Sequence, residues 1–357
     1  AALAARVDLP DLLGMDRVDP DTITGRWSAP PPGLAAVIGK SSKGPVTIDV
    51  ESDGPHGLVG GMTNSGKSEL LQSFVLSLAA SYPPDRLNFL LVDYKGGTAF
   101  KDCVGLPQTV GLVTDLDGQL VERALVSLNA EIRRRERVLR DHGAKDAAEL
   151  RRLAPSQALP SLVIVVDEFY ALATELPEFI EGMVDVAARG RALGLHLLLA
   201  TQRPDDRVVD DNIRANSNLK ILLRVAEDQD SSGLIGVPDA ARIDRSLPGR
   251  AFVRTGHDEL TEVQTAYSGG ASLADSDLHE LEIQLVAFDG RPIPSRRRDT
   301  TAEAVPDSAR LVTAMADAAV ELSIPQQRSP WLPQLPPIVP MTTLSASGAD
   351  DAETATI

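Results

Sequence analysis

One octapeptide constrains this chain more than any other part of its sequence. It reads Gly-Met-Thr-Asn-Ser-Gly-Lys-Ser over residues 61–68, and it matches the phosphate-loop pattern G-x-x-x-x-G-K-[ST] at every fixed position. Glycines let the backbone turn its N–H groups inward around phosphate oxygens, and a following helix points the positive end of its dipole at the same charge. We predict a strand at 57–60 and a helix at 69–78, which gives the order strand, loop, helix.

The phosphate-loop pattern predicts which groups its side chains contact. Lys67 is expected to reach the β- and γ-phosphates of a bound nucleotide, and Ser68 to place its hydroxyl on Mg²⁺. An ordinary glycine-rich turn is the alternative, and it would match the pattern by chance in roughly one chain in a hundred of this length. The predicted nucleotide-binding residues are Gly61, Met62, Thr63, Asn64, Ser65, Gly66, Lys67, Ser68 and Glu69.

A second apolar strand delivers two acids at its carboxyl end. The run Leu-Val-Ile-Val-Val at 162–166 is followed by Asp167 and Glu168, which matches a Walker B element. Asp167 is predicted to hold the Mg²⁺ shell, and Glu168 to orient and deprotonate the attacking water. The alternative is a chance pair of acids, which is common after a strand. Such a pair is very unlikely to follow a phosphate loop by about a hundred residues by accident.

Two further strands are expected to end at the same edge of the sheet. The run at 87–92 ends in Asp93, which forms either a structural ion pair with Lys95 or part of the site. The run at 195–201 ends in Gln202, which we expect to face the γ-phosphate and report its presence; a polar strand end without nucleotide contact is the alternative. His196 is more readily explained as a satisfied core histidine than as a ligand.

The alternation of strands and helices specifies an α/β domain with a largely parallel sheet. A β-hairpin is predicted before the phosphate loop, and a second one closes the domain at 251–266. We divide the chain into a lead-in segment (1–33), the main domain (34–270) and a C-terminal linker (271–357). The linker is expected to hold an amphipathic helix at 310–323 and a disordered tail from 346. Trp331 and Leu332 either dock in a pocket or belong to a flexible tether.

Five arginines lie in the second half of a helix predicted at 119–140. Apolar residues at Val121, Leu125, Leu128 and Ile132 define one face of this helix, which Asp117 can cap and Gly143 can end. Because cations are favourable near a helix C-terminus, we interpret the arginines as a solvated face.

Composition limits the possible partners. The 357 residues carry a net charge of -16, so the surface as a whole should repel nucleic acid and anionic membrane. The single cysteine, Cys103, excludes an internal disulfide. The sequence contains no apolar run of the roughly 18 residues that span a bilayer, although membrane anchoring elsewhere in a longer chain stays open.

Taken together, five sequence segments resemble the FtsK/SpoIIIE-type ATPases, over about residues 37–266. The segments are the phosphate loop, Asp93-Tyr94-Lys95-Gly96-Gly97, Val165 to Phe169, Arg189 to Gly194, and Ala200 to Pro204. Within that superfamily the chain looks most like the EccC ATPases of type VII secretion systems, especially their first ATPase domain. Gly111 to Leu116, Leu195 to Pro204 and Ser329 to Pro333 carry this closer likeness.

The resemblance implies a RecA-like motor domain that works as a ring, usually a hexamer, with ATP and Mg²⁺ held between neighbours. It implies an arginine finger supplied in trans; Arg123 matches the family position best, and Arg189 or Arg191 is the fallback. Further ATPase domains in the same chain, helical WXG-type secreted proteins and a membrane secretion complex are the implied partners. The domain is then cytoplasmic, within a parent protein anchored in the inner membrane. Asn64 departs from the family, which commonly has glycine there.

Three functions are compatible with these residues. The first is a protein-secretion motor that hydrolyses ATP. A double-stranded DNA translocase uses the same motor, but the negative charge and the lack of a basic winged-helix segment in this sequence oppose it. An ATP-binding scaffold with little or no turnover is the third, because contacts with linkers can silence first domains in this family.

Overall fold

The apolar runs of the sequence form ten strands of one sheet. They are β1 (Ala35–Ser41), β2 (Gly44–Asp49), β3 (His56–Gly60), β4 (Leu87–Asp93), β5 (Thr109–Thr114), β6 (Ser161–Asp167), β7 (Leu195–Thr201), β8 (Leu219–Leu223), β9 (Arg250–Thr255) and β10 (Thr261–Thr265). The computed structural model describes residues 3–94, 99–114, 118–175, 177–202, 217–256, 260–271 and 305–330. Within these residues the strand order is β2-β1-β10-β9-β8-β3-β7-β6-β4-β5.

The sheet has a parallel half and an antiparallel half. From β8 to β5 all neighbouring strands are parallel, whereas the pairs from β2 to β8 are antiparallel. The two predicted hairpins, β1–β2 and β9–β10, belong to the antiparallel half. The fold expected from the sequence, an α/β domain with a largely parallel sheet and an N-terminal hairpin, is confirmed.

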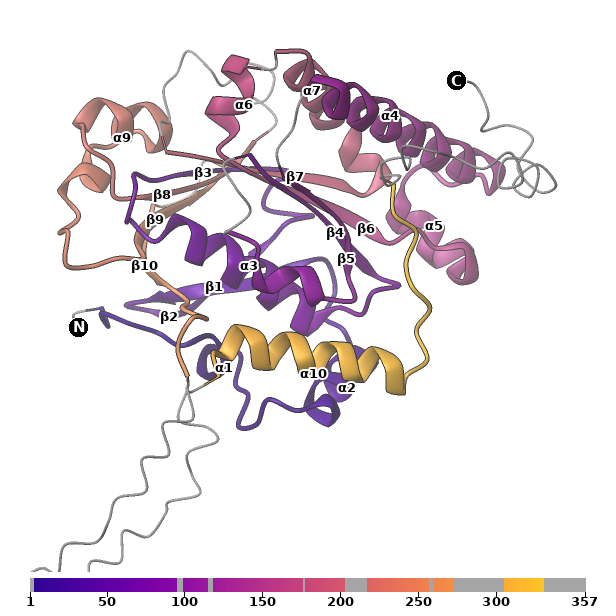
Figure 1. Cartoon of the computed structure of the whole chain (residues 1–357), viewed down its shortest axis with the longest axis horizontal. Coiled ribbons are helices and arrows are strands. Elements are labelled where there is room, and N and C mark those ends of the chain that lie inside the picture. Colours follow the sequence, from indigo (N-terminus) through magenta and orange to yellow (C-terminus); the bar gives the residue numbers. More distant parts are fainter. Residues whose placement is uncertain are drawn as a thin grey trace, which may run out of the picture.

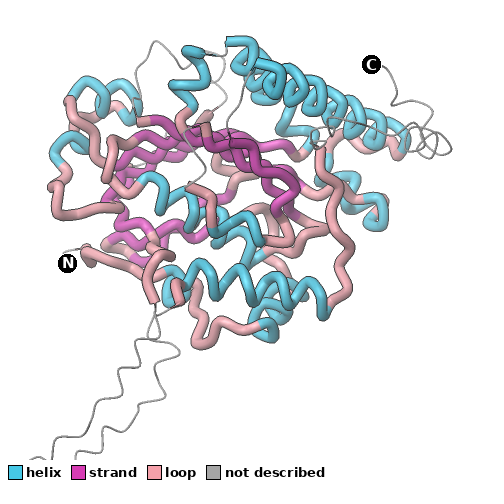
Figure 2. Tube along the Cα trace, viewed as in Figure 1, coloured by secondary structure: helices cyan, strands magenta, loops and turns pink. Residues whose placement is uncertain are grey.

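Helices cover both faces of this sheet (Figures 1 and 2). On one face lie α1 (Leu9–Leu12), α2 (Pro20–Ser28), α3 (Lys67–Ser81) and α10 (Asp307–Glu321). On the other face lie α4 (Gly118–Asp141), α5 (Ala147–Leu153), α6 (Phe169–Glu175), α7 (Pro177–Leu193) and α9 (Asp228–Ile235). Among the described residues no helix is both long enough and apolar enough to cross a bilayer.

The continuous apolar strands are explained by these two layers. Successive side chains of a strand point to opposite faces, and in β4 Phe89 and Leu91 join the core under α3 while Leu90 and Val92 join the core under α4 and α7. All seven residues of β4, β6 and β7 are buried. The central strands therefore show no polar alternation, because neither face meets water.

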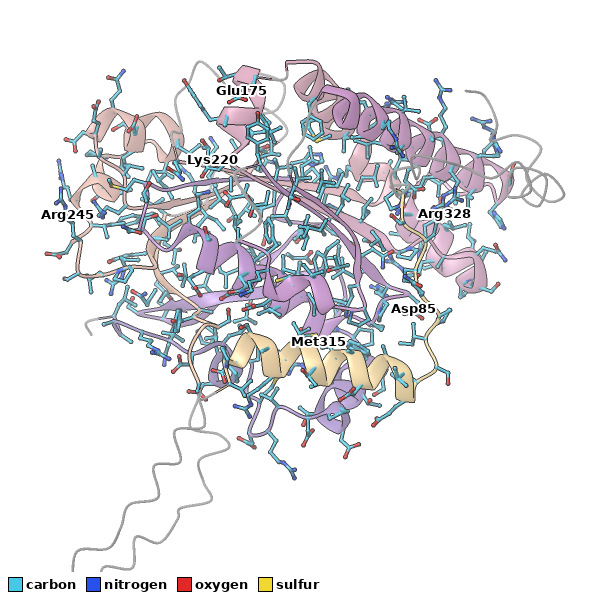
Figure 3. The ribbon with its side chains drawn as sticks, viewed as in Figure 1. Asp85, Glu175, Lys220, Arg245, Met315 and Arg328 are labelled. Atoms are coloured by element: carbon cyan, nitrogen blue, oxygen red, sulfur yellow. The ribbon has the colours of Figure 1, made fainter. Side chains whose placement is uncertain are left out.

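Residues on both sides of the main domain pack into the same core. Ile23 and Trp27 of α2 are buried, and the Trp27 indole N–H donates to the Ala79 carbonyl of α3 at 2.9 Å. The predicted C-terminal helix is present as α10, and its Leu311 and Met315 are completely buried. Figure 3 labels Met315 on this helix. The sequence pattern indicated neither helix of the lead-in segment, α1 or α2, nor strand β5.

The arginine-rich end of α4 corrects one expectation. Arg135 is not on a solvated face: only 3% of it is exposed. Its guanidinium donates to Glu131 at 2.7 Å, to the Leu193 carbonyl at 2.9 Å and to the Pro160 carbonyl at 2.9 Å. Arg133 is exposed, as expected. The charge run therefore contains one structural cation, which pairing and carbonyl contacts make tolerable in the core.

Some predictions fall on parts of the chain outside the described residues. They concern Lys95, the cap at Asp117, Arg203 and Pro204 after β7, the docking of Trp331 and Leu332, and the tail from 346. Gly143 does end α4, in the left-handed conformation with φ +62°.

Candidate functional site

The phosphate loop lies at the carboxyl edge of the parallel half of the sheet. Strand β3 sits between β7 and β8, and both neighbours hold the start of the loop: Gly61 N–H donates to the Thr201 carbonyl at 3.1 Å, and Met62 N–H donates to the Arg224 carbonyl at 3.0 Å. Further along, the Ser65 carbonyl accepts from Gly249 N–H at 2.8 Å. Three separate parts of the chain thus fix the path of the loop.

The conformation of the loop depends on two unusual backbone positions. Gly66 has φ +98°, and a Cβ there would lie 2.6 Å from the backbone nitrogen of Gly249, so only glycine fits. Asn64 has φ +61°, in the left-handed region that asparagine enters more readily than other residues with a side chain. The departure from the family glycine is therefore compatible with the turn that the loop makes.

Lys67, Asp167 and Glu168 come together as a buried cluster of charges. The Lys67 ammonium contacts an Asp167 carboxylate oxygen and donates to Glu168 Oε1 at 3.1 Å. All three residues are at most 5% exposed. Burial raises the pKa of Asp167, and the neighbouring Lys67 ammonium acts in the opposite direction. The sequence predicted this meeting of loop and acids, but not that the lysine would contact both carboxylates directly.

Gln202 connects the acid pair to the phosphate loop. Because β7 lies between β3 and β6, its carboxyl end falls between the loop and Glu168. Gln202 Nε2 donates to Glu168 Oε1 at 2.6 Å, and Gln202 Oε1 accepts from the Thr63 hydroxyl at 2.9 Å. An ionised carboxylate only accepts hydrogen bonds, so the amide must turn its nitrogen toward Glu168 and its oxygen toward Thr63.

Glu168 itself has a strained backbone that the sequence did not indicate. Its φ is +59°, and its N–H donates to Asp167 Oδ1 at 2.9 Å. Non-glycine residues in this region cost about 1–2 kcal/mol and occur preferentially at functional sites. The turn from β6 into α6 aims the Glu168 carboxylate back toward the loop, where it meets Lys67.

The donor and acceptor groups fit a magnesium nucleotide. The first N–H groups of α3 have no carbonyl partner within the helix and face the loop, as anion sites at helix N-termini require. The Ser65 hydroxyl is buried and has no hydrogen-bond partner among the described residues. A hydroxyl at Ser68 and a carboxylate at Asp167 are the oxygen ligands that Mg²⁺ prefers.

Other predicted residues lie around this centre. Asp93 is buried, and its carboxylate accepts from Ala99 N–H at 3.0 Å. The Tyr94 hydroxyl contacts Glu175, which lies at the end of α6 and is labelled in Figure 3. Nothing in the sequence indicated this pair. His196 is buried at the other end of β7, with Nδ1 near the Pro55 carbonyl at 3.2 Å. Its Nε2 has no partner among the described residues, so the core histidine is only half satisfied.

The candidate finger arginines lie at opposite ends of the parallel strands, Arg123 at the carboxyl ends and Arg189 and Arg191 at the amino ends. Thr114 of β5 pairs with Asp93, which pairs with Asp167, so α4 begins at the carboxyl edge and Arg123 lies in its second turn. Arg189 and Arg191 lie near the end of α7, at the amino edge, and Arg189 pairs with Glu136 at 3.2 Å.

Comparison with known proteins gives relatives that are proteins of type VII or ESX secretion systems. The type VII secretion system protein EssC of Staphylococcus aureus (strain Mu50 / ATCC 700699) is 36% identical over 361 residues, covering 94% of this chain and 24% of EssC. The ESX secretion system protein EccC of Geobacillus thermodenitrificans (strain NG80-2) is 35% identical, covering 88% of this chain and 22% of EccC. The chain thus spans about a quarter of the length of these relatives.

Solved structures and a family model agree with them. The cytoplasmic domain of the type VII secretion ATPase EccC from Thermomonospora curvata superposes with a TM-score of 0.77 at 30% identity, covering 93% of this chain and 36% of that one. The pCW3 conjugation coupling protein TcpA shares the fold, with a TM-score of 0.57 at 24% identity over 66% of each chain. The FtsK/SpoIIIE family model matches residues 24–206. With a phosphate loop, an acid pair and relatives among the type VII secretion ATPases, this chain belongs to the FtsK/SpoIIIE family.

Proposed function

We propose that this chain is an ATP-binding and ATP-hydrolysing motor domain of a type VII protein secretion ATPase. One observation carries the proposal: Lys67 of the phosphate loop, Asp167 and Glu168 after β6, and Gln202 after β7 form one connected buried cluster. The cluster combines a phosphate loop, a glutamate with strained backbone and an amide that bridges the two. It lies at the carboxyl ends of parallel strands, where such sheets bind ligands, and a purely structural ion pair would rarely show all of these features.

Each residue has a role in this mechanism. Bound Mg²⁺ would neutralise phosphate charge, with Ser68 and Asp167 as its protein ligands. Lys67 leaves the two carboxylates to contact the phosphates, which frees Glu168 to accept a proton from water. Gln202 keeps its hydrogen bond to Glu168 and thereby holds the general base in place. Because Gln202 also contacts Thr63, a movement of the phosphate loop shifts Gln202 and with it the position of the Glu168 carboxylate.

Two substitutions test the site. Lys67→Ala should abolish ATP binding, because it removes the only ammonium in the described cluster that can reach the phosphates.

Glu168→Gln should preserve ATP binding and reduce hydrolysis by about 10²-fold or more, because it removes the general base. Binding is measured by calorimetry and turnover by phosphate release, with the exposed Lys101→Ala as the matched control. Equal ATP affinity for wild type and Lys67→Ala would refute the assignment.

We further propose that Arg123 reaches the nucleotide of a neighbouring subunit in a ring and is needed there for full turnover. Arginine fingers that act in trans contribute about 10³ to 10⁵ in rate. Its place at the carboxyl edge, with Arg189 and Arg191 at the amino edge, favours it over them. Mixing Arg123→Ala subunits with Glu168→Gln subunits should restore turnover, because mixed interfaces combine one intact finger with one intact base. Absence of rescue at every mixing ratio would contradict a finger at this position.

The partners follow from the relatives rather than from the site. We propose that the parent protein carries further ATPase domains, is anchored in the cytoplasmic membrane, holds this domain in the cytoplasm, and exports helical proteins of the WXG type. Binding of a purified WXG-type helical dimer to the full-length parent protein, with and without ATP, tests this. Binding that neither requires the parent chain nor responds to ATP would contradict it.

A DNA translocase is the alternative within the same family. The net charge of -16 opposes it, since DNA binding depends on neutralising phosphates with basic side chains. We therefore expect weak binding to a 30-base-pair duplex even at low salt. Tight binding that weakens steeply between low and moderate salt would favour the translocase.

A scaffold that binds ATP without turnover is the second alternative. Phosphate release is measured on the isolated chain and again after fusion to a hexameric ring-forming protein that enforces contact between subunits. The motor predicts that turnover rises on enforced assembly, because a neighbour then supplies its arginine. Unchanged, negligible turnover from a ring verified by mass would favour the scaffold.

A further inference from the structure

A cavity of about 280 Å³ lies directly beside the phosphate loop. We call it the α3 pocket, because Gly66 and Glu69 at the start of α3 form one wall. Gly249 and the segment from Gln264 to Tyr267 form the second wall, and Arg6 from the lead-in segment closes the third. The pocket therefore begins where the phosphate-binding backbone ends.

The walls of the pocket combine a planar stack with apolar side chains. The Arg6 guanidinium carbon lies 4.6 Å from the centre of the Tyr267 ring. Ala5, Pro248 and Ala266 supply apolar surface beside them. Aromatic rings and guanidinium planes are the side-chain groups on which nucleic-acid bases stack.

One acceptor in the pocket has no partner. Glu69 Oε2 is buried and makes no hydrogen bond to any described residue, although backbone N–H groups of Ser268 and Gly269 approach its carboxylate. A hydroxyl donor would satisfy this oxygen, whereas another phosphate would be repelled by it. Carboxylates at nucleotide sites commonly accept from ribose hydroxyls.

Backbone pairing holds the third wall in place. Tyr267 N–H donates to the Val7 carbonyl at 2.8 Å, and Leu9 N–H donates to the Tyr267 carbonyl at 2.9 Å. Arg6 also pairs with Asp8 at 2.8 Å. The backbone bridge thus places the lead-in segment beside the chain that follows β10, and the Arg6 guanidinium lies over the Tyr267 ring.

We propose that the α3 pocket binds the nucleoside end of the nucleotide, with the base against the Arg6–Tyr267 stack and the ribose hydroxyls toward Glu69. This inference rests on the proposed function, since it locates the rest of the molecule whose phosphates the loop holds. It also assigns a binding role to the lead-in segment.

The test compares ATP with inorganic tripolyphosphate, which has the phosphates but no nucleoside. Calorimetry of the whole chain with Mg²⁺ should show ATP binding weakened about threefold by Arg6→Ala and about tenfold by Tyr267→Ala. Tripolyphosphate affinity should stay unchanged in both variants. Arg17→Ala, at an exposed arginine that pairs with Asp19, should bind ATP as wild type does.

A second measurement remains available if Tyr267→Ala does not fold. Photolysis of wild type with 8-azidoadenosine triphosphate should label peptides that contain Arg6 or Tyr267, and excess ATP should suppress the label. The inference is overturned by ATP affinity that both variants leave unchanged, by equal weakening of ATP and tripolyphosphate, or by label confined to other peptides. Wild type that binds neither ligand would overturn the proposed function as well, whereas the preceding outcomes leave that function standing.

Discussion

At the scale of single residues, burial decides the chemistry of His196. The ring lies at the amino end of β7, with only 2% of the residue exposed. Burial lowers its pKa to about 4, from 6.5, because the charged imidazolium would lose its hydration. The nearby His56 and Arg135 act in the same direction, and the Pro55 carbonyl opposes them. His196 is therefore neutral in the folded protein at every physiological pH.

This shift predicts how stability depends on pH. Between pH 6.5 and 4 the unfolded chain takes up a proton at His196 and the folded chain does not, so stability falls as the pH falls, by up to about 3 kcal/mol in total. Urea unfolding of His196→Gln at several pH values should show a shallower loss over this window than wild type. The exposed His142→Gln should retain the wild-type slope. Coincident slopes for wild type and His196→Gln would contradict the prediction.

At the scale of elements, Arg135 joins three of them. From α4 it contacts the carbonyl of Leu193 at the end of α7 and that of Pro160 just before β6, while Glu131 one turn earlier balances its charge. The last carbonyls of a helix have no partner within it. The Arg135 guanidinium therefore satisfies the Leu193 carbonyl, which would otherwise be buried without a hydrogen bond. This contact helps fix α7, and with it the connection from the acid pair to β7.

Arg135→Met should therefore destabilise the protein by about 3 kcal/mol, because it leaves a buried carboxylate and two carbonyls without this donor. Arg133→Met, two residues away and exposed, should change stability by less than about 0.5 kcal/mol. Chemical denaturation of both variants measures the difference. Similar losses for the two would mean that Arg135 has no special structural role.

At the scale of the whole molecule, segments from both ends of the chain pack on the phosphate-loop helix. Helix α2 contacts α3 through Trp27, and α10 buries Met315 against the same layer (Figure 3). Ser308 of α10 donates to Asp102 at 2.7 Å, which in turn accepts from Gln72 of α3 at 2.9 Å. The helix that positions the loop is thus supported by residues far outside the family-specific motifs.

Met315→Ala should cost about 2–5 kcal/mol, because it leaves a cavity between α10 and the core. Val320→Ala on the same helix should have little effect, since 78% of Val320 is exposed. Unfolding followed by calorimetry should give one transition shifted to lower temperature for Met315→Ala. A cost no larger than that of Val320→Ala would show that α10 is not part of the cooperative core.

Much of the architecture could be predicted because local patterns carried it. The strand at 87–93 has the predicted bounds, and the helix predicted at 119–140 differs from α4 by one residue at each end. Buried strands are continuously apolar and amphipathic helices have a regular spacing, so both can be read from short segments. Burial of Arg135 and the left-handed Glu168 could not be predicted. Both depend on which carbonyls or charges a distant part of the chain brings near, and no local pattern records that.

The class of fold, the phosphate loop and the pair of acids can be predicted from the amino-acid sequence alone. Glycine freedom, apolar periodicity and the chemistry of lysine and carboxylate are properties of short segments. Tertiary structure decided that β7 lies between β3 and β6. This order places Gln202 between Thr63 and Glu168. Pairing of the lead-in segment with the chain after β10 places Arg6 and Tyr267 in the pocket beside Gly66. Neighbours across a sheet are chosen by packing and hydrogen bonding between segments far apart in sequence, so these contacts exist only in the folded chain.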